Sequence, residues 1–303
     1  MIDKSLIIEE DTLVNCPVDY EGRVVVPEGI TDIGDKAFMF CNKVTEVILP
    51  QSLQSIGLCS FHGCGISRID IPESVTYISD AAFLACLNLR EVQLPEGLTI
   101  ISDSMFGGCS ELDSIKIPSS VTIIRDSAFD ECTKLSSVRL PKELKKLESF
   151  AFADCVSLKS IEIPDGCQDI GFAAFRGCTS LESMIMPDSV TSERSGDGCF
   201  IACSSLKKVK LSNSMISVPS NCFEDCENLV EVQFSVNTRW IEGDAFKNCK
   251  SLQEIVLPSK TVEVCENAFV GCESLSHIKA PMSTVFCDTA FRGCANVTIE
   301  RYL

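Results

Sequence analysis

Apolar residues recur along this chain in a pattern that repeats about every 23 residues. Each repeat contains a phenylalanine followed three positions later by a cysteine, as in Phe106 and Cys109. Twelve such pairs occur, and their phenylalanines are Phe38, Phe61, Phe83, Phe106, Phe129, Phe152, Phe175, Phe200, Phe223, Phe246, Phe269 and Phe291. A fixed period between about 20 and 50 residues is typical of repeat architectures. The sequence therefore predicts one elongated repeat domain, although the length alone would suggest two ordinary domains.

The apolar positions between two pairs predict one strand in each repeat. Leu112, Ile115 and Ile117 end in a period-2 alternation, which is typical of a short strand with one buried face. Pro118 should end the strand, because proline has no N–H to donate to a ladder. The apolar pair that follows is expected to carry the chain round a bend. The segment that ends in Phe-x-x-Cys is too short for a full helix, so we expect a single helical or 3₁₀ turn there.

Stacking of these repeats explains how each one buries its apolar side. A single coil cannot do so alone, but each Phe, Leu, Ile and Cys can lie on its copy in the next coil. The strands must then be parallel, since every coil runs in the same direction. We expect residues 1–23 to form an N-terminal cap and residues 24–303 to form the repeat domain. Within the cap, short strands over 6–8 and 12–14 are expected to form a hairpin.

The repeat resembles the BspA-type leucine-rich repeats of bacterial and protist surface proteins. The motif [IL]-P-x-x-V-x-x-I-x-x-x-A-F-x-x-C-x-x-L-x-x-[IV] matches Ile71 to Val92 and Ile117 to Val138 almost position for position. The resemblance implies a solenoid that is a curved right-handed coil, with a parallel β-sheet on the concave side and short helical or 3₁₀ turns on the convex side. It also implies a non-enzymatic, protein-binding role, with adhesion to host or matrix proteins as the alternative, although a fold does not fix a function.

The charge of the chain bears on its partners. The 43 acidic and 26 basic residues give a net charge of −17. This balance disfavours nucleic acid and anionic membranes as partners, and an acidic coat is the ordinary way to keep a long solenoid soluble. A protein partner is therefore expected, of unknown identity, and the sequence leaves the oligomeric state open.

Nineteen cysteines are present, and twelve of them occupy the one column of the repeat. Cysteine in such a column acts as a small buried hydrophobe, and an odd total cannot pair completely within the chain. We therefore expect a reduced, structural column. The other seven are Cys16, Cys59, Cys167, Cys199, Cys222, Cys265 and Cys287.

The N-terminal sequence, MIDKSLIIEEDT, lacks the basic and apolar regions of a secretory leader, and no apolar run approaches 18 residues. The expected location is therefore the cytoplasm, or the cell surface if a leader has been removed.

Catalysis is not expected, because only two histidines, His62 and His277, are present and no nucleotide or nucleophile motif occurs. The Cys59-x-x-His62-x-Cys64 run lacks a fourth ligand, so we expect neither a metal nor another cofactor.

The outward side chains of the predicted sheet carry the clearest functional signal. Serines follow one another in four successive repeats, with basic and apolar residues beside them, which departs from the acidic trend of the chain. Extended concave surfaces are where solenoids bind partners. We therefore predict a partner-binding patch for an acidic segment, although an ordinary solvated sheet face would look similar. Its residues are Ser114, Lys116, Ser137, Arg139, Ser160, Glu162, Ser183, Ile185, Lys208 and Lys210.

Two further features lie outside that patch. A polar insertion over 191–198 is expected to protrude as a loop, most simply a tolerated surface insertion. Tyr77 and Trp240 fall in another column, where lateral packing is favoured over a surface role.

Overall fold

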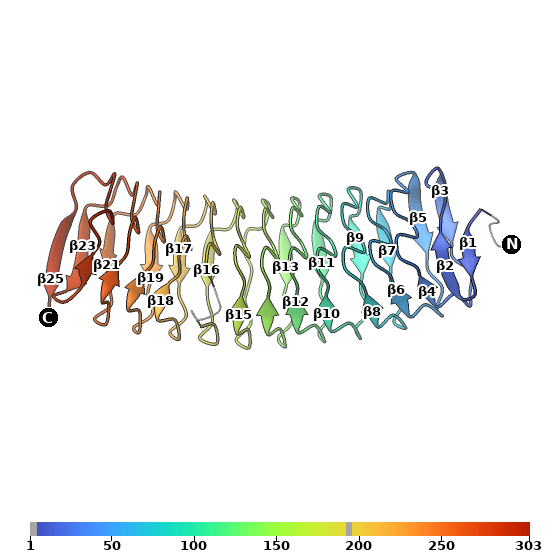
Figure 1. Ribbon diagram of the computed structural model, residues 1–303, viewed down its shortest axis with the longest axis horizontal. Coiled ribbons are helices and arrows are strands. Elements are labelled where there is room, and N and C mark those ends of the chain that lie inside the picture. The colour runs from blue at the N-terminus through green and yellow to red at the C-terminus, as the bar shows by residue number, and fades with distance from the viewer. Residues whose placement is uncertain (1–4, 192–195) are drawn as a thin grey trace. The chain divides into compact units, whose positions relative to one another are not determined.

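The computed structural model describes residues 5–191 and 196–303. The chain divides into two compact units, Met1–Leu144 and Lys145–Leu303. Each unit is a parallel β-solenoid, in which successive coils lie side by side along the unit (Figure 1). This confirms the predicted repeat solenoid, while the predicted division after residue 23 stays a prediction.

The longer strand of each coil is the one that the sequence predicts. Where neighbouring long strands pair, they do so in parallel, with a register in which equivalent repeat positions face each other, as Ile115 faces Val138. In unit 1 these strands are β3 (Gly22–Val25), β5 (Val44–Ile48), β7 (Arg68–Asp70), β9 (Glu91–Gln93), β11 (Ser114–Lys116) and β13 (Ser137–Arg139). In unit 2 they are β16 (Ser183–Ile185), β17 (Lys208–Lys210), β19 (Glu231–Gln233), β21 (Glu254–Val256), β23 (His277–Pro281) and β25 (Thr298–Tyr302). We call the outward side of these strands the long-strand face of each unit.

A second set of strands, which the sequence analysis interpreted as a bend, runs along another side of each coil. Except for β2, these strands are only two residues long. Unit 1 has β2 (Thr12–Asn15), β4 (Asp32–Ile33), β6 (Ser55–Ile56), β8 (Tyr77–Ile78), β10 (Ile100–Ile101) and β12 (Ile123–Ile124). Unit 2 has β14 (Lys146–Leu147), β15 (Asp169–Ile170), β18 (Ser217–Val218), β20 (Trp240–Ile241), β22 (Glu263–Val264) and β24 (Val285–Phe286). Their outward side is the short-strand face.

The N-terminal hairpin forms as expected. Strand β1 (Ile7–Glu9) pairs antiparallel with β2, which then pairs in parallel with β4. The hairpin thus starts the short-strand ladder of unit 1.

A stack of phenylalanine rings fills the centre of each unit. The rings of Phe38 and Phe61 lie 4.8 Å apart between centroids and are inclined by only 5°. In unit 2, the rings of Phe200 and Phe223 stack in the same way, with a centroid distance of 5.6 Å and an interplanar angle of 2°. Both pairs are fully buried. Because each ring is covered by its copies, the period of the sequence becomes the period of the core.

The cysteine column is buried except for the half-buried Cys294, and its thiols donate hydrogen bonds to backbone carbonyls of other coils. The thiol of Cys109 donates to the carbonyl of Phe83 at 3.2 Å, and that of Cys178 donates to Phe152 at the same distance. Burial raises the pKa of Cys178 to about 12. Cys16 is outside the column, and its backbone carbonyl accepts the hydrogen bond of the first column thiol, that of Cys41, at 3.5 Å.

The predicted helical or 3₁₀ turn at Phe-x-x-Cys is wrong: no helix occurs over residues 5–191 and 196–303. In every coil but the last, the residues two positions before and after the phenylalanine adopt left-handed conformations, such as Ser104 at φ 51° and Gly108 at φ 68°. This alternation turns every second peptide toward the next coil, so Phe106 N–H donates to Ala128 O at 2.9 Å. The intervening Cys109 N–H donates within its own coil, to Phe106 O. The turn is therefore a third hydrogen-bonded side of the coil.

Two other expectations concern single segments. Half of the loop expected over 191–198, residues 192–195, lies outside the described residues. In the part of the chain that is described, no helix could cross a membrane.

Candidate functional site

The long-strand face is built by alternation along each three-residue strand. In β11 the central Ile115 is buried, and Ser114 and Lys116 on either side are exposed. The same pattern holds in β7, β16 and β21. Two outward columns therefore run along each unit, as the sequence predicts.

In unit 1 the structure brings four of the predicted residues together. Strands β11 and β13 pair with Ser114 opposite Ser137 and Lys116 opposite Arg139. All four side chains are exposed. The two small serine side chains leave a shallow surface, and the long side chains of Lys116 and Arg139 lie beside it.

The two cations differ in their surroundings. Lys116 Nζ lies 2.6 Å from Glu96 Oε1, and this hydrogen bond raises the pKa of the lysine and lowers that of the glutamate. Glu96 also accepts the backbone N–H of Ser119 at 3.2 Å, so its position is fixed by the next coil. Arg139 has no carboxylate within 4 Å among the described residues. Of the two cations predicted in this part of the face, Arg139 is therefore the one that is not compensated by an ion pair.

In unit 2 the face combines an apolar side chain with cations. Strands β16 and β17 place Ser183 opposite Lys208 and Ile185 opposite Lys210. The side chain of Ile185 is 65% exposed. Lys208 pairs with Glu231 at 2.7 Å, whereas no ion pair of Lys210 occurs in the described part of the chain.

Ser160 and Glu162 are exposed, but the strand expected around them is not formed. The backbone of residues 158–164 has no assigned strand, although it carries the apolar alternation of the repeat. Of the predicted residues in unit 2, these two therefore lie outside the ladder that holds β16 and β17.

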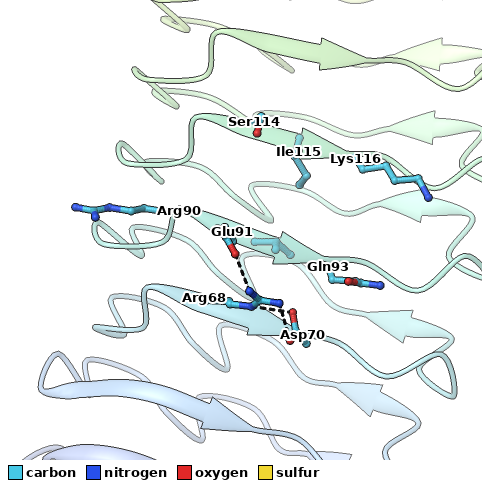
Figure 2. A pocket seen from close by; sticks show the side chains of 9 residues that line it. Arg68, Asp70, Arg90, Glu91, Gln93, Ser114, Ile115 and Lys116 are labelled. Atoms are coloured by element: carbon cyan, nitrogen blue, oxygen red, sulfur yellow. Dashed lines mark hydrogen bonds and ion pairs between the residues drawn. The ribbon is translucent and has the colours of Figure 1, made fainter.

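Unit 1 also contains a hollow on its long-strand face that the sequence analysis missed. It lies where the ladder is interrupted, because β9 and β11 belong to separate sheets. Figure 2 shows the side chains around it, with Arg68 held between two carboxylates. Arg68 Nη1 lies 2.9 Å from Glu91 and Nη2 lies 3.1 Å from Asp70. These neighbours also raise the pKa of Arg68, mainly through its hydrogen bonds to Asp70.

The spacing of these charges in the sequence could have indicated the pair. Arg68 and Glu91 are 23 residues apart, which places them on adjacent coils in the same column. Arg23 and Glu46 pair in the same way at 3.2 Å. The hollow thus offers mixed, largely compensated charge, unlike the uncompensated Arg139.

Comparison with protein families gives a clear match to this repeat. The model of the BspA type leucine rich repeat region matches in six copies, over residues 7–133, 101–196 and 192–298. The chain belongs to the BspA-type leucine-rich repeat family. No curated protein matches the chain significantly.

Solved structures of bacterial proteins agree with this assignment. A leucine-rich repeat protein from Bacteroides ovatus is 34% identical, over 92% of this chain and 77% of that one, with a TM-score of 0.86. A leucine rich cell surface protein from Faecalibacterium prausnitzii is 24% identical over 99% and 94% of the two chains, with a TM-score of 0.53. A leucine-rich repeat protein from Eubacterium ventriosum is 23% identical over 82% and 76%, at 0.54. The last two likenesses show the fold alone.

Proposed function

We propose that this protein binds another protein through its long-strand face and has no catalytic activity. Members of this family are leucine-rich repeat proteins, and leucine-rich repeat solenoids commonly mediate protein interactions through such extended surfaces. The partner presents acidic side chains to the cations of the face.

The observation that carries the proposal is the pairing of Ile185 with Lys210 across β16 and β17. An apolar side chain exposed by 65% supplies contact area, and the adjacent cation selects for negative charge. In a chain with a net charge of −17, cations grouped on one face are out of trend. Unit 1 offers a comparable site, with Arg139 beside the floor of Ser114 and Ser137.

The alternative is a cell-surface module with many weak, distributed contacts. The resemblance of the repeat to those of surface proteins favours it, and the Faecalibacterium prausnitzii neighbour is itself described as a cell surface protein. The two functions differ in how strongly binding depends on a few cations of the long-strand face. A face-specific partner should be lost when those cations are reversed, whereas distributed contacts should survive.

The test is capture from a cell extract by the intact chain and by the variant Lys116→Glu, Arg139→Glu, Lys210→Glu. A matched control variant carries Lys43→Glu, Lys260→Glu and Arg292→Glu, which make the same change in charge at other exposed positions. A protein held by the intact chain and the control, and lost with the face variant, supports the proposal. Equal capture by all three chains would overturn it in favour of distributed contacts.

A further inference from the structure

The short-strand ladder of unit 1 is interrupted at one place. Strand β8 ends one sheet and β10 begins the next, so no ladder hydrogen bond joins them. In the neighbouring coils, the residue after each short strand donates its backbone N–H to a carbonyl of the preceding coil, as Arg125 does to Ile101 O at 3.0 Å. Here the hydroxyl of Ser102 donates to Ile78 O instead, at 2.6 Å. A hydrogen bond from a side chain therefore replaces the backbone hydrogen bond that joins the other coils.

A hollow lies at this interruption. The part of its lining that faces solvent includes an aromatic ring, since Tyr77 is 58% exposed. Lateral packing, which the sequence analysis favoured for this residue, is therefore wrong. The remaining lining consists of hydroxyls, an apolar floor and two charges, from Thr76, Ile78, Asp80, Leu98, Thr99, Ile100, Ser102 and Arg125. Small-molecule sites have this composition, in which apolar surface is joined by a few convergent polar groups.

The two opposite charges favour a ligand with no net charge. The Asp80 carboxylate opposes an anion, and the Arg125 guanidinium opposes a cation. Arg125 also pairs with Asp103 at 3.3 Å, and Asp103 N–H donates to Asp80 Oδ1 at the same distance. The side chains are thus held in place, and they still provide donors and acceptors to a ligand that carries no charge.

We propose that this hollow binds a neutral pyranose ring of a glycan. One side of such a ring presents C–H groups that pack on an aromatic face, here that of Tyr77. Its hydroxyls both donate and accept, which suits the Asp80 carboxylate, the Arg125 guanidinium and the threonine hydroxyls together. This inference does not depend on the proposed protein binding, because the site lies on the short-strand face.

A lysine side chain from a protein partner is the rival ligand, since a cation can also lie over Tyr77 near a carboxylate. The position of Arg125 in the same hollow disfavours it. Saturation-transfer NMR on the full chain distinguishes the two, with cellotriose, maltotriose and triacetylchitotriose as saccharide probes. Nα-acetyl-lysine methylamide is the cationic probe.

We expect at least one trisaccharide to receive saturation on the C–H protons of a ring, and the lysine probe to receive none. Tyr77→Ala should raise the dissociation constant of that saccharide about twofold to tenfold, which is the range for the loss of one aromatic contact. Thr99→Trp, which fills the hollow from an exposed position, should abolish binding. The control is Phe172→Ala, which removes an aromatic ring exposed by 49% in unit 2 and should change nothing.

Three results would overturn the proposal. One is the absence of saturation transfer to all three saccharides. Another is binding that Tyr77→Ala and Thr99→Trp leave intact, or that Phe172→Ala removes as well. The third is binding of the lysine probe alone, which would assign the hollow to a cationic side chain.

Discussion

At the scale of single residues, the turn imposes the strictest demands. Position two after each phenylalanine is left-handed whether it holds glycine, as at Gly177, or a larger residue, as at Glu131 and Ala202. A left-handed conformation costs about 1–2 kcal/mol for a residue with a Cβ atom. The coil keeps it because the peptide there donates to the next coil, as Gly177 N–H does to Ile201 O at 2.8 Å.

Gly177→Ala should lower the thermal stability of the chain. The φ of +70° strains an alanine, and its Cβ would collide with the Asp154 side chain. Gly108→Ala is the matched control, because φ is +68° there and the new Cβ would meet nothing closer than 3.5 Å. Calorimetry should show a loss of about 1 kcal/mol or more for both, and a larger one for Gly177→Ala. Equal stability of the wild-type chain and both variants would contradict this account of the turn.

The buried thiols should make the protein sensitive to alkaline pH. Burial raises the pKa of Cys178 to about 12, well above the value of an exposed thiol near 8.5. The thiol therefore stabilises the fold fully below about pH 8.5, and this contribution declines as the pH rises toward 12, because only the unfolded chain ionises there. The decline is about 1.4 kcal/mol per pH unit for each such thiol.

Measurements of unfolding at pH 7.5, 8.5 and 9.5 check this dependence. Cys178→Ala should be less stable than the wild type at pH 7.5 and should lose stability less steeply above pH 8.5. Parallel curves for the two chains would show that the Cys178 thiol is not buried in the way described.

At the scale of elements, hydrogen bonding between coils decides where the surface opens. The hollow around Arg68 lies where β9 and β11 are not paired, and the hollow at Tyr77 lies where β8 and β10 are not paired. Interrupted rungs leave backbone groups without their usual partners, so polar side chains gather there. The bridge from Ser102 to Ile78 is the clearest example.

Removal of that bridge should destabilise unit 1. Ser102→Ala would leave the Ile78 carbonyl without its donor at a buried position, which costs about 1–3 kcal/mol. Ser119→Ala is the control, since the Ser119 hydroxyl is exposed and lies 3.3 Å from Glu96. The difference in unfolding free energy between the two variants measures the contribution of the hydrogen bond from Ser102 to Ile78. Equal unfolding free energies would contradict a stabilising role for this bond.

The same comparison of elements shows how far the sequence could predict the fold. The 23-residue period predicted the long strands, their parallel pairing and their outward columns, because one alternating strand recurs in each repeat. The short strands were missed, since two residues such as Asp32 and Ile33 are too few to show a period of two. The left-handed turns were missed because many of those positions hold ordinary residues, such as Lys36 and Phe40, instead of glycine.

The candidate site was predicted in part for related reasons. The outward columns followed from alternation, so the exposed positions of Lys116, Arg139 and Ile185 were predicted, while their role in binding stays a prediction. The interrupted rungs could not be predicted, because the repeats on either side of them have ordinary spacing. Pairing between coils, as between Lys116 and Glu96, depends on side-chain reach and is not visible in a single repeat.

At the scale of the whole molecule, charge governs how partners approach. The net charge of −17 repels acidic molecules in general, and many cations are paired with carboxylates on the neighbouring coil, as Lys250 is with Glu227 at 2.7 Å. Under the proposed function, an acidic partner would have to reach the few cations of the long-strand face that have no ion pair among the described residues. Arg139 and Lys210 are the ones that the proposal uses.

Binding of a captured partner should consequently depend on salt. Raising NaCl from about 0.05 M to 0.5 M shortens the Debye length to a few ångströms and should slow association several-fold, with a smaller effect on dissociation. Surface plasmon resonance on the intact chain separates the two rates. Association that is unaffected by salt, or faster at high salt, would argue against recognition through Arg139 and Lys210.

Site-specific photo-crosslinking tests directly whether the partner binds the long-strand face. A benzophenone amino acid is introduced at Ser183 or Ile185 on the long-strand face, and, as a control, at Val236, which is 66% exposed in a turn. We expect the partner to crosslink from Ser183 and Ile185 and not from Val236. Equal crosslinking from all three positions, or crosslinking from Val236 alone, would contradict binding through the long-strand face.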